Sequence, residues 1–139
     1  MRRATAVALM LAALVLAACG GGGPHEPSSE EQTAIEARFS EYIEAYGKGD
    51  AEAVCATVSP DIVEEMGGDE ACQKAYEPTL GKGGEELAKA LEESGYDRIE
   101  VADDGSIARM YFPEATVPLR FEPVDDDWYV VPPDSISGA

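Results

Sequence analysis

The chain has 139 residues, and its 10 Lys and Arg against 28 Asp and Glu give a formal net charge of −18. A chain of this length supports one small domain with a single core of modest size. The acidic balance argues against nucleic acid, because phosphate contacts need clustered Lys and Arg, and against lying flat on an anionic lipid surface. A cationic protein partner stays compatible with this charge.

The first 18 residues have the composition of a secretion signal. Met1-Arg2-Arg3 is a short positive segment, and residues 4–16 carry no charge. A helix over residues 4–16 would span about 20 Å, short of the ~30 Å hydrocarbon core of a bilayer. We therefore predict a signal peptide over residues 1–18 rather than a membrane-spanning helix.

The segment Leu16-Ala17-Ala18-Cys19 follows the apolar run directly. It resembles the lipobox of bacterial lipoproteins, and the resemblance implies cleavage before Cys19 and a diacylglyceryl group on its sulfur. Two acyl chains are enough for stable attachment, so the prediction is a lipid-anchored protein on the extracytoplasmic face of the cell membrane. A plain secreted protein with a chance cysteine is the alternative.

Residues 19–29 hold the lipidated cysteine and a segment that cannot form a core. Four glycines, two prolines and His25, the one histidine in the sequence, lie in this segment. Such a composition predicts a flexible tether, in which a catalytic histidine is not expected.

With Cys19 lipidated, Cys55 and Cys72 remain as a pair. Two cysteines in an extracytoplasmic protein predict a disulfide, and their spacing would stabilise the fold by about 3 kcal/mol in the chain-entropy model. A metal site is disfavoured because no further Cys or His ligands lie nearby, and a redox pair because the Cys-x-x-Cys spacing is absent. We expect no metal and no cofactor.

Helices are predicted first along the chain. An apolar stripe of helical period follows Ser29, the predicted N-cap, and Gly47 and Gly49 end that helix. Residues 81–84 are predicted to be a flexible loop, and Glu77-Pro78 to end the helix before it. The stripe consists of Ile35, Phe39, Tyr42, Ile43 and Tyr46, and the shorter predicted helices cover residues 51–58, 60–66, 69–76 and 85–94.

From Asp97 onward the apolar period changes to two, which predicts strands. Asp104-Gly105 indicates a hairpin turn, and residues 125–127 indicate another; a calcium loop would need more widely spaced oxygen ligands. Pro118 indicates an edge or bulged strand. The predicted strands cover residues 98–102, 107–112, 116–122 and 128–131, before a frayed tail at 133–139.

Helices followed by antiparallel strands define an α+β class. The junction Tyr46-Gly47-Lys48-Gly49-Asp50 and the closing segment Val124-Asp125-Asp126-Asp127-Trp128-Tyr129-Val130 are similar to the nuclear-transport-factor-2-like superfamily, especially its small actinobacterial lipoproteins. The resemblance covers residues 30–132. It implies a cone in which N-terminal helices pack on a curved antiparallel sheet, whose concave side often holds a pocket.

Enzymes of that superfamily, such as ketosteroid isomerase and scytalone dehydratase, place Asp, Tyr or His in the pocket. Here residues 30–132 contain no histidine, and Glu100, Glu114 and Glu122 occupy positions typical of solvent-facing side chains. We therefore assign no catalytic residue. The candidate ligand-pocket residues are Tyr42, Tyr46, Tyr111 and Trp128, although tyrosines on an apolar stripe are more often part of a core.

Three functions stay open at this point. The favoured one is a non-enzymatic lipoprotein that binds a small apolar ligand or docks a protein. The second is a small enzyme of isomerase or dehydratase type, with a buried carboxylate as its base. The third is a homodimeric module that pairs through the sheet face carrying Ile107 and Tyr111.

Overall fold

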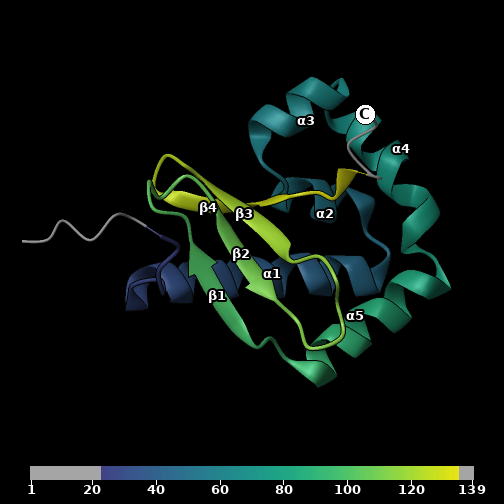
Figure 1. The fold of residues 1–139 in the computed structure, drawn as a ribbon. Helices are drawn as coiled ribbons and strands as arrows, with labels where there is room; N and C mark the ends of the chain where they lie inside the picture. Colours follow the sequence, from purple (N-terminus) through teal and green to yellow (C-terminus); the bar gives the residue numbers. More distant parts are fainter. Residues whose placement is uncertain (1–22, 135–139) are drawn as a thin grey trace, which may run out of the picture.

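The computed structural model describes residues 23–134, which form five helices followed by a four-stranded antiparallel sheet (Figure 1). The predicted α+β class, with helices packed on a sheet, is confirmed. The predicted signal peptide and Cys19 lie outside the described residues. The elements are α1 (Ser29–Lys48), α2 (Ala51–Thr57), α3 (Pro60–Met66), α4 (Asp69–Leu80), α5 (Lys82–Ser94), β1 (Arg98–Val101), β2 (Ala108–Tyr111), β3 (Leu119–Val124) and β4 (Asp127–Val131).

Helix α1 begins with a capping box. The Ser28 hydroxyl accepts a hydrogen bond from the Glu31 N–H at 3.2 Å, and the Glu31 carboxylate accepts one from the Ser28 N–H at 2.8 Å. These bonds satisfy N–H groups that a helix start leaves unpaired. The N-cap is therefore Ser28 and not the predicted Ser29. The helix ends at Gly49, whose φ of 69° lies in the left-handed region that glycine adopts without strain.

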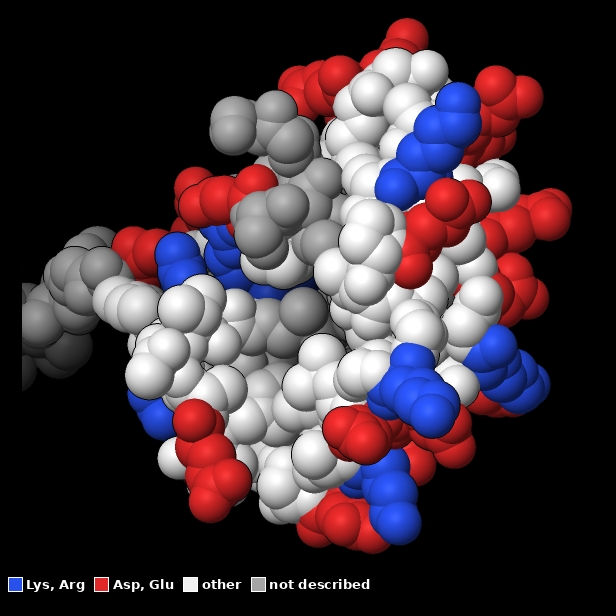
Figure 2. All heavy atoms as spheres, turned by 90° about the vertical axis from the view of Figure 1, so that its right-hand side faces the viewer, with Lys and Arg blue, Asp and Glu red and all other residues white. Residues whose placement is uncertain are grey.

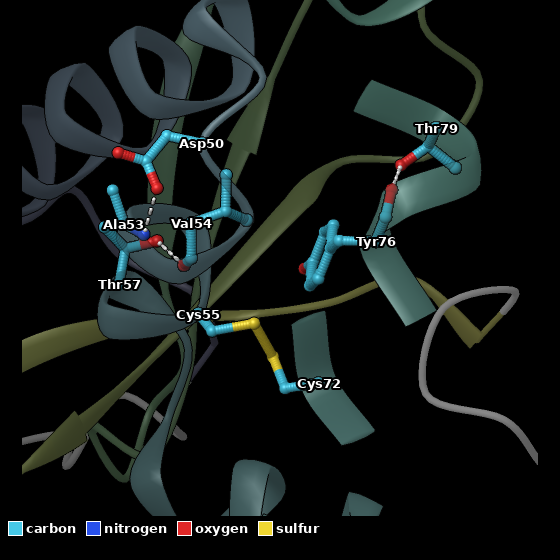
Figure 3. The surroundings of a disulfide bond; sticks show 8 residues. All are labelled: Asp50, Ala53, Val54, Cys55, Thr57, Cys72, Tyr76 and Thr79. Carbon is cyan, nitrogen blue, oxygen red and sulfur yellow. Dashed lines mark hydrogen bonds between the residues drawn. A yellow bond between two sulfur atoms is a disulfide. The ribbon is translucent and has the colours of Figure 1, made fainter. Parts of the chain in front are cut away.

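The predicted disulfide between Cys55 and Cys72 is confirmed (Figure 3). It joins α2 to α4, and both cysteines are buried. Asp50 caps α2 as predicted, since its carboxylate accepts a hydrogen bond from the Ala53 N–H at 3.0 Å. The bridge therefore closes the chain segment that contains α3 and attaches α4 to the part of the core beside α1.

The end of α4 and the start of α5 differ from the prediction. Pro78 lies inside α4, so the predicted end at Glu77 is wrong. Proline removes one hydrogen bond of the helix, but Tyr76 and Leu80 on either side are buried in the core and hold the last turn in place. The predicted loop at residues 81–84 is also wrong, because Gly81 alone separates α4 from α5.

Gly84 explains why a glycine-rich segment is helical here. It is buried in the first turn of α5, and a Cβ at this position would lie 2.9 Å from the Thr79 carbonyl oxygen and 3.3 Å from the Tyr46 ring. The absence of a side chain therefore lets α5 approach α1 closely. Tertiary packing outweighs the low helix propensity of glycine at this crossing.

The four strands form a meander in the order β1-β2-β3-β4 (Figure 1). Strand β3 begins after Pro118, so the predicted strand at residues 116–122 is shifted toward the C-terminus and Pro118 lies outside it. Pro123 does lie in β3, opposite Trp128 of β4. The register of β3 with β2 ends at Phe121, so Pro123 needs no N–H for a bond to β2.

Other segments of the chain cover parts of both sheet edges. On the β1 edge, the His25 N–H donates to the Val101 carbonyl at 2.9 Å, and the His25 carbonyl accepts from the Val101 N–H at 2.8 Å. On the β4 edge, the Ser59 N–H donates to the Val130 carbonyl at 3.0 Å. Covered edges resist pairing with other chains. The structure therefore attaches residue 25 of the predicted tether to the sheet.

Gly84→Ala should lower the free energy of unfolding by about 1–3 kcal/mol, because the added methyl group overpacks the contact between α5 and α1. Gly83→Ala is the matched control, since a Cβ there meets nothing within 4 Å. Helix propensity alone predicts that the control raises stability, by at most about 1 kcal/mol. Urea denaturation measures both; equal effects of the two substitutions would contradict the close approach at Gly84.

Candidate ligand-binding pocket

A cavity of about 720 Å³ lies where the sheet meets α1, α4 and α5. Its volume is within the range of small-molecule sites, about 300–1,000 Å³. Figure 2 views the molecule from the side of α4 and α5: a largely uncharged surface is hollowed near its middle, with acidic side chains mostly around the perimeter. The cavity has a helix wall, a loop wall and a strand wall.

The helix wall is mainly apolar and aromatic. Helix α1 contributes Tyr42 and Tyr46, which are four residues apart and therefore lie on one face of the helix. Helix α5 contributes Leu87 and Leu91 at the same spacing. The close packing of α5 on α1 at Gly84 brings these two pairs to a common cavity. The full helix wall is Tyr42, Ile43, Tyr46, Thr79, Leu87 and Leu91.

The loop wall comes from the connection between β2 and β3. Its Val117 is 68% exposed, and Leu87 on the helix wall is 48% exposed. These are the exposed large hydrophobic residues of the described chain, and both lie on the cavity. Exposed apolar side chains gathered at one opening are typical of a binding site. The loop wall consists of Phe112, Ala115, Val117, Pro118 and Leu119.

The strand wall combines two arginines with an apolar residue. Arg109 of β2 is the register partner of Arg120 of β3, which in turn is the partner of Val131 of β4. Register partners lie side by side on one face of a sheet, so the three residues form a row. Pro133 and Asp134, which the sequence placed in the frayed tail, continue this wall.

Tyr42 and Tyr46 belong to a cluster of three tyrosines. Tyr76 of α4 lies behind them, with its ring centroid 6.4 Å from that of Tyr42 and 6.3 Å from that of Tyr46. The first two rings are 5.5 Å apart. Edge-to-face and tilted contacts at these distances are favourable. The cluster therefore gives the two tyrosines of the cavity a rigid support.

Two phenol groups of this cluster, those of Tyr42 and Tyr76, are held neutral. Burial raises the pKa of Tyr76 to about 12, and burial together with the neighbouring Tyr76 also raises the pKa of Tyr42. The Tyr42 and Tyr76 hydroxyls influence each other electrostatically, but the buried Tyr76 hydroxyl makes no hydrogen bond of normal geometry within residues 23–134. At neutral pH these groups can donate hydrogen bonds but are poor bases.

Of the four predicted pocket residues, the structure brings Tyr42 and Tyr46 together on the cavity. Tyr111 and Trp128 do not line it. Tyr111 lies on the same face of β2 as Arg109 but outside the cavity, and the Arg98 guanidinium covers its ring at 3.9 Å from the centroid. Trp128 is buried at the other end of β4 from Val131. Cys19 lies outside the described residues.

Arg109, Arg120, Leu87, Leu91 and Phe112 are cavity residues that the sequence did not identify. The period of α5 predicts an inward face with Leu87 and Leu91, but not that part of this face stays open to solvent. The two arginines alternate with apolar residues on consecutive strands, which is a weak signal. Their juxtaposition needed the register, which strand patterns alone do not determine.

Comparison with protein-family models, with curated proteins and with solved structures gave no match for this chain. Within residues 23–134, no group of three or more His, Cys, Asp or Glu side chains is arranged to hold a metal ion. None of the described helices is both long and apolar enough to cross a bilayer. The geometry of the cavity therefore carries the functional inference.

Tyr76→Phe should leave the protein as stable at pH 7, or more stable by about 1 kcal/mol, because within residues 23–134 the lost hydroxyl is buried with no hydrogen bond of normal geometry. The raised pKa makes a further prediction. Above pH 10 the unfolded state loses the phenol proton and the folded state keeps it, so the wild type loses stability up to about pH 12. The variant should lose about 2–3 kcal/mol less over this interval.

Urea denaturation at pH 7, 10 and 11.5 measures this difference between Tyr76→Phe and the wild type. Parallel stability curves for the two proteins would show that the Tyr76 phenol is not shielded from water in the folded state.

Proposed function

We propose that this protein is a lipid-anchored extracytoplasmic lipoprotein that binds a small, largely apolar ligand without converting it. The observation that carries the proposal is the cavity of about 720 Å³, whose helix and loop walls are apolar and whose opening holds Leu87 and Val117. A pocket lined mostly by hydrophobic and aromatic side chains, with a few polar groups, is the usual form of a small-molecule site.

The compartment is supported by two independent features. The disulfide between Cys55 and Cys72 suits an oxidising environment outside the cytoplasm. The apolar run before Cys19 has the length and flanks of a signal peptide. The arrangement of helices on an antiparallel sheet is also compatible with the proposed nuclear-transport-factor-2-like cone. In this proposal the cavity domain stands close to the outer face of the membrane.

Catalysis of the isomerase or dehydratase type is less well supported, because it needs a shielded base in the pocket. Among the described residues that line the cavity, the one with a carboxylate side chain is Asp134. Its side chain is 91% exposed, and it lies 3.5 Å from Arg120. Such an exposed group is open to water and is not the shielded base that this chemistry needs.

Self-pairing through the sheet face that carries Ile107 and Tyr111 is also less well supported. That face carries several charged residues, and Arg98 covers the ring of Tyr111, so the proposed contact residue is not freely available. Arg98 is in turn paired with Glu100 at 2.9 Å. An interface core depleted of charge is the usual requirement for a stable homodimer. The cavity is the better candidate for molecular recognition.

The anchor is tested by Cys19→Ala, which removes the sulfur proposed to carry the lipid. The wild type expressed in a Gram-positive host should fractionate with membranes and enter solution only with detergent. The variant should be found in the aqueous fraction, because it lacks both acyl chains. Immunoblots of the fractions and the intact mass of the wild type measure this. A wild type that is released without detergent would contradict the anchor.

The cavity is tested with the neutral apolar dye Nile red in the Cys19→Ala chain, which avoids detergent. The dye should bind saturably at one site. Leu87→Asp should weaken its binding about tenfold, because a charge then lies at the apolar opening. Ala90→Asp, an exposed position on the same helix that does not line the cavity, is the matched control. Absent dye binding, or equal weakening by both substitutions, would contradict an apolar binding site.

A further inference from the structure

The strand wall places two positive charges next to each other in a strongly acidic protein. Arg109 and Arg120 are direct register partners on β2 and β3, and both line the cavity. Like charges at directly opposed positions of a sheet are destabilising. Since only 10 of the 139 residues are Lys or Arg, a pair of this kind inside a cavity calls for a counter-charge.

The chain itself supplies little of that counter-charge. The Arg120 guanidinium lies 3.5 Å from both the Asp134 carboxylate and the Pro132 carbonyl oxygen, beyond the 2.7–2.9 Å of a strong charge-assisted bond. Arg109 donates no side-chain hydrogen bond and forms no ion pair within 4 Å in the described part of the chain. Its cross-strand neighbour Glu100 instead accepts from Arg98 at 2.9 Å.

Two arginines away from the cavity, Arg38 and Arg98, make shorter polar contacts by comparison. Arg38 donates to the Trp128 carbonyl at 2.7 Å, pairs with Glu41 at 2.9 Å and covers the Tyr129 ring at 4.6 Å. Arg98 pairs with Glu100 and covers Tyr111. The two arginines of the cavity differ from both because neither makes a hydrogen bond or an ion pair shorter than 3.5 Å within residues 23–134.

We propose that the cavity binds an amphiphile with one anionic head group, held by Arg109 and Arg120, and an apolar chain that lies along the helix and loop walls. This inference rests on the proposed function and defines the class of its ligand. The planar fork of a guanidinium matches the two oxygens of a carboxylate or a phosphate. Two adjacent guanidinium groups that are partly shielded from water favour binding of an anionic head group over a neutral or a cationic head group.

The charge of the whole protein makes the apolar chain necessary. A net charge of −18 repels small anions in solution, so an anion without a chain gains only the contacts of the strand wall. An acyl chain adds the burial of methylene groups against Tyr42, Leu87, Leu91 and Phe112, at about 0.8 kcal/mol for each group. Acetate and inorganic phosphate are therefore not expected to bind appreciably.

The test is displacement of Nile red from the Cys19→Ala chain by four compounds that share a sixteen-carbon chain: palmitate, hexadecyl phosphate, hexadecanol and hexadecyltrimethylammonium. Each is used below the concentration at which it forms micelles. The two anions should displace the dye at about tenfold lower concentration than the alcohol, as expected for charge-assisted hydrogen bonds. The cation should be the weakest competitor. Whichever anion is tighter identifies the head group.

Arg109→Gln/Arg120→Gln should remove the advantage of the anions and leave displacement by hexadecanol unchanged. This variant also relieves the like-charge contact, so it is expected to fold. Arg109→Lys/Arg120→Lys keeps the charge and should keep part of the preference. Lys74→Gln/Lys89→Gln is the charge-matched control, because both lysines are exposed on helices and do not line the cavity, and it should behave as the parent chain does.

The outcomes separate this inference from the proposed function. If Nile red binds and the anions compete no better than hexadecanol, the anionic head group is wrong and the apolar site stands. If the cation competes best, the inference is wrong as well. If the dye does not bind, both proposals fail. Loss of the anion preference in Lys74→Gln/Lys89→Gln would show that the net charge of the protein, and not the arginine pair, produces the preference.

Discussion

Helix α1 contacts β4 as well as α2, α4 and α5, and its buried stripe lies against all of them. Burial of this stripe removes apolar surface from water, which is the main stabilising contribution available to a small domain. The disulfide attaches α4 through α2 to the same group of elements, and Gly84 lets α5 approach. Helix α1 is therefore the surface that α2, α4, α5 and β4 share.

The cavity is a consequence of where that packing ends. In the first half of α1 the stripe is completely covered, as at Ile35, whereas Tyr42, Ile43 and Tyr46 further along line the space between α5 and the sheet. Tyr76 closes that space from behind, and the connection between β2 and β3 passes across its front. Helix α1 thus contributes both to the stable core and to the open site. The rigid core holds the side chains of the site in position.

Local signals predicted most of the elements because each has a physical cause within a few residues. The stripe of α1, the Asp50 cap and the Asp104-Gly105 turn depend on neighbours along the chain, and all three are present. The errors fall where distant contacts decide. Pro78 and Gly84 are helical because Tyr76, Leu80 and Tyr46 hold them there, and β3 is displaced because its register follows β2 and β4.

The sequence by itself determined the class of fold, the disulfide and the acidic surface, since periodicity, cysteine number and charge are properties of the chain before it folds. It also placed Tyr42 and Tyr46 on one helix face. Only the tertiary structure decided that Leu87, Val117 and these tyrosines border one cavity, and that Arg109 and Arg120 stand side by side in it. Strand register and helix crossing bring such residues together, and both follow from packing over the whole domain.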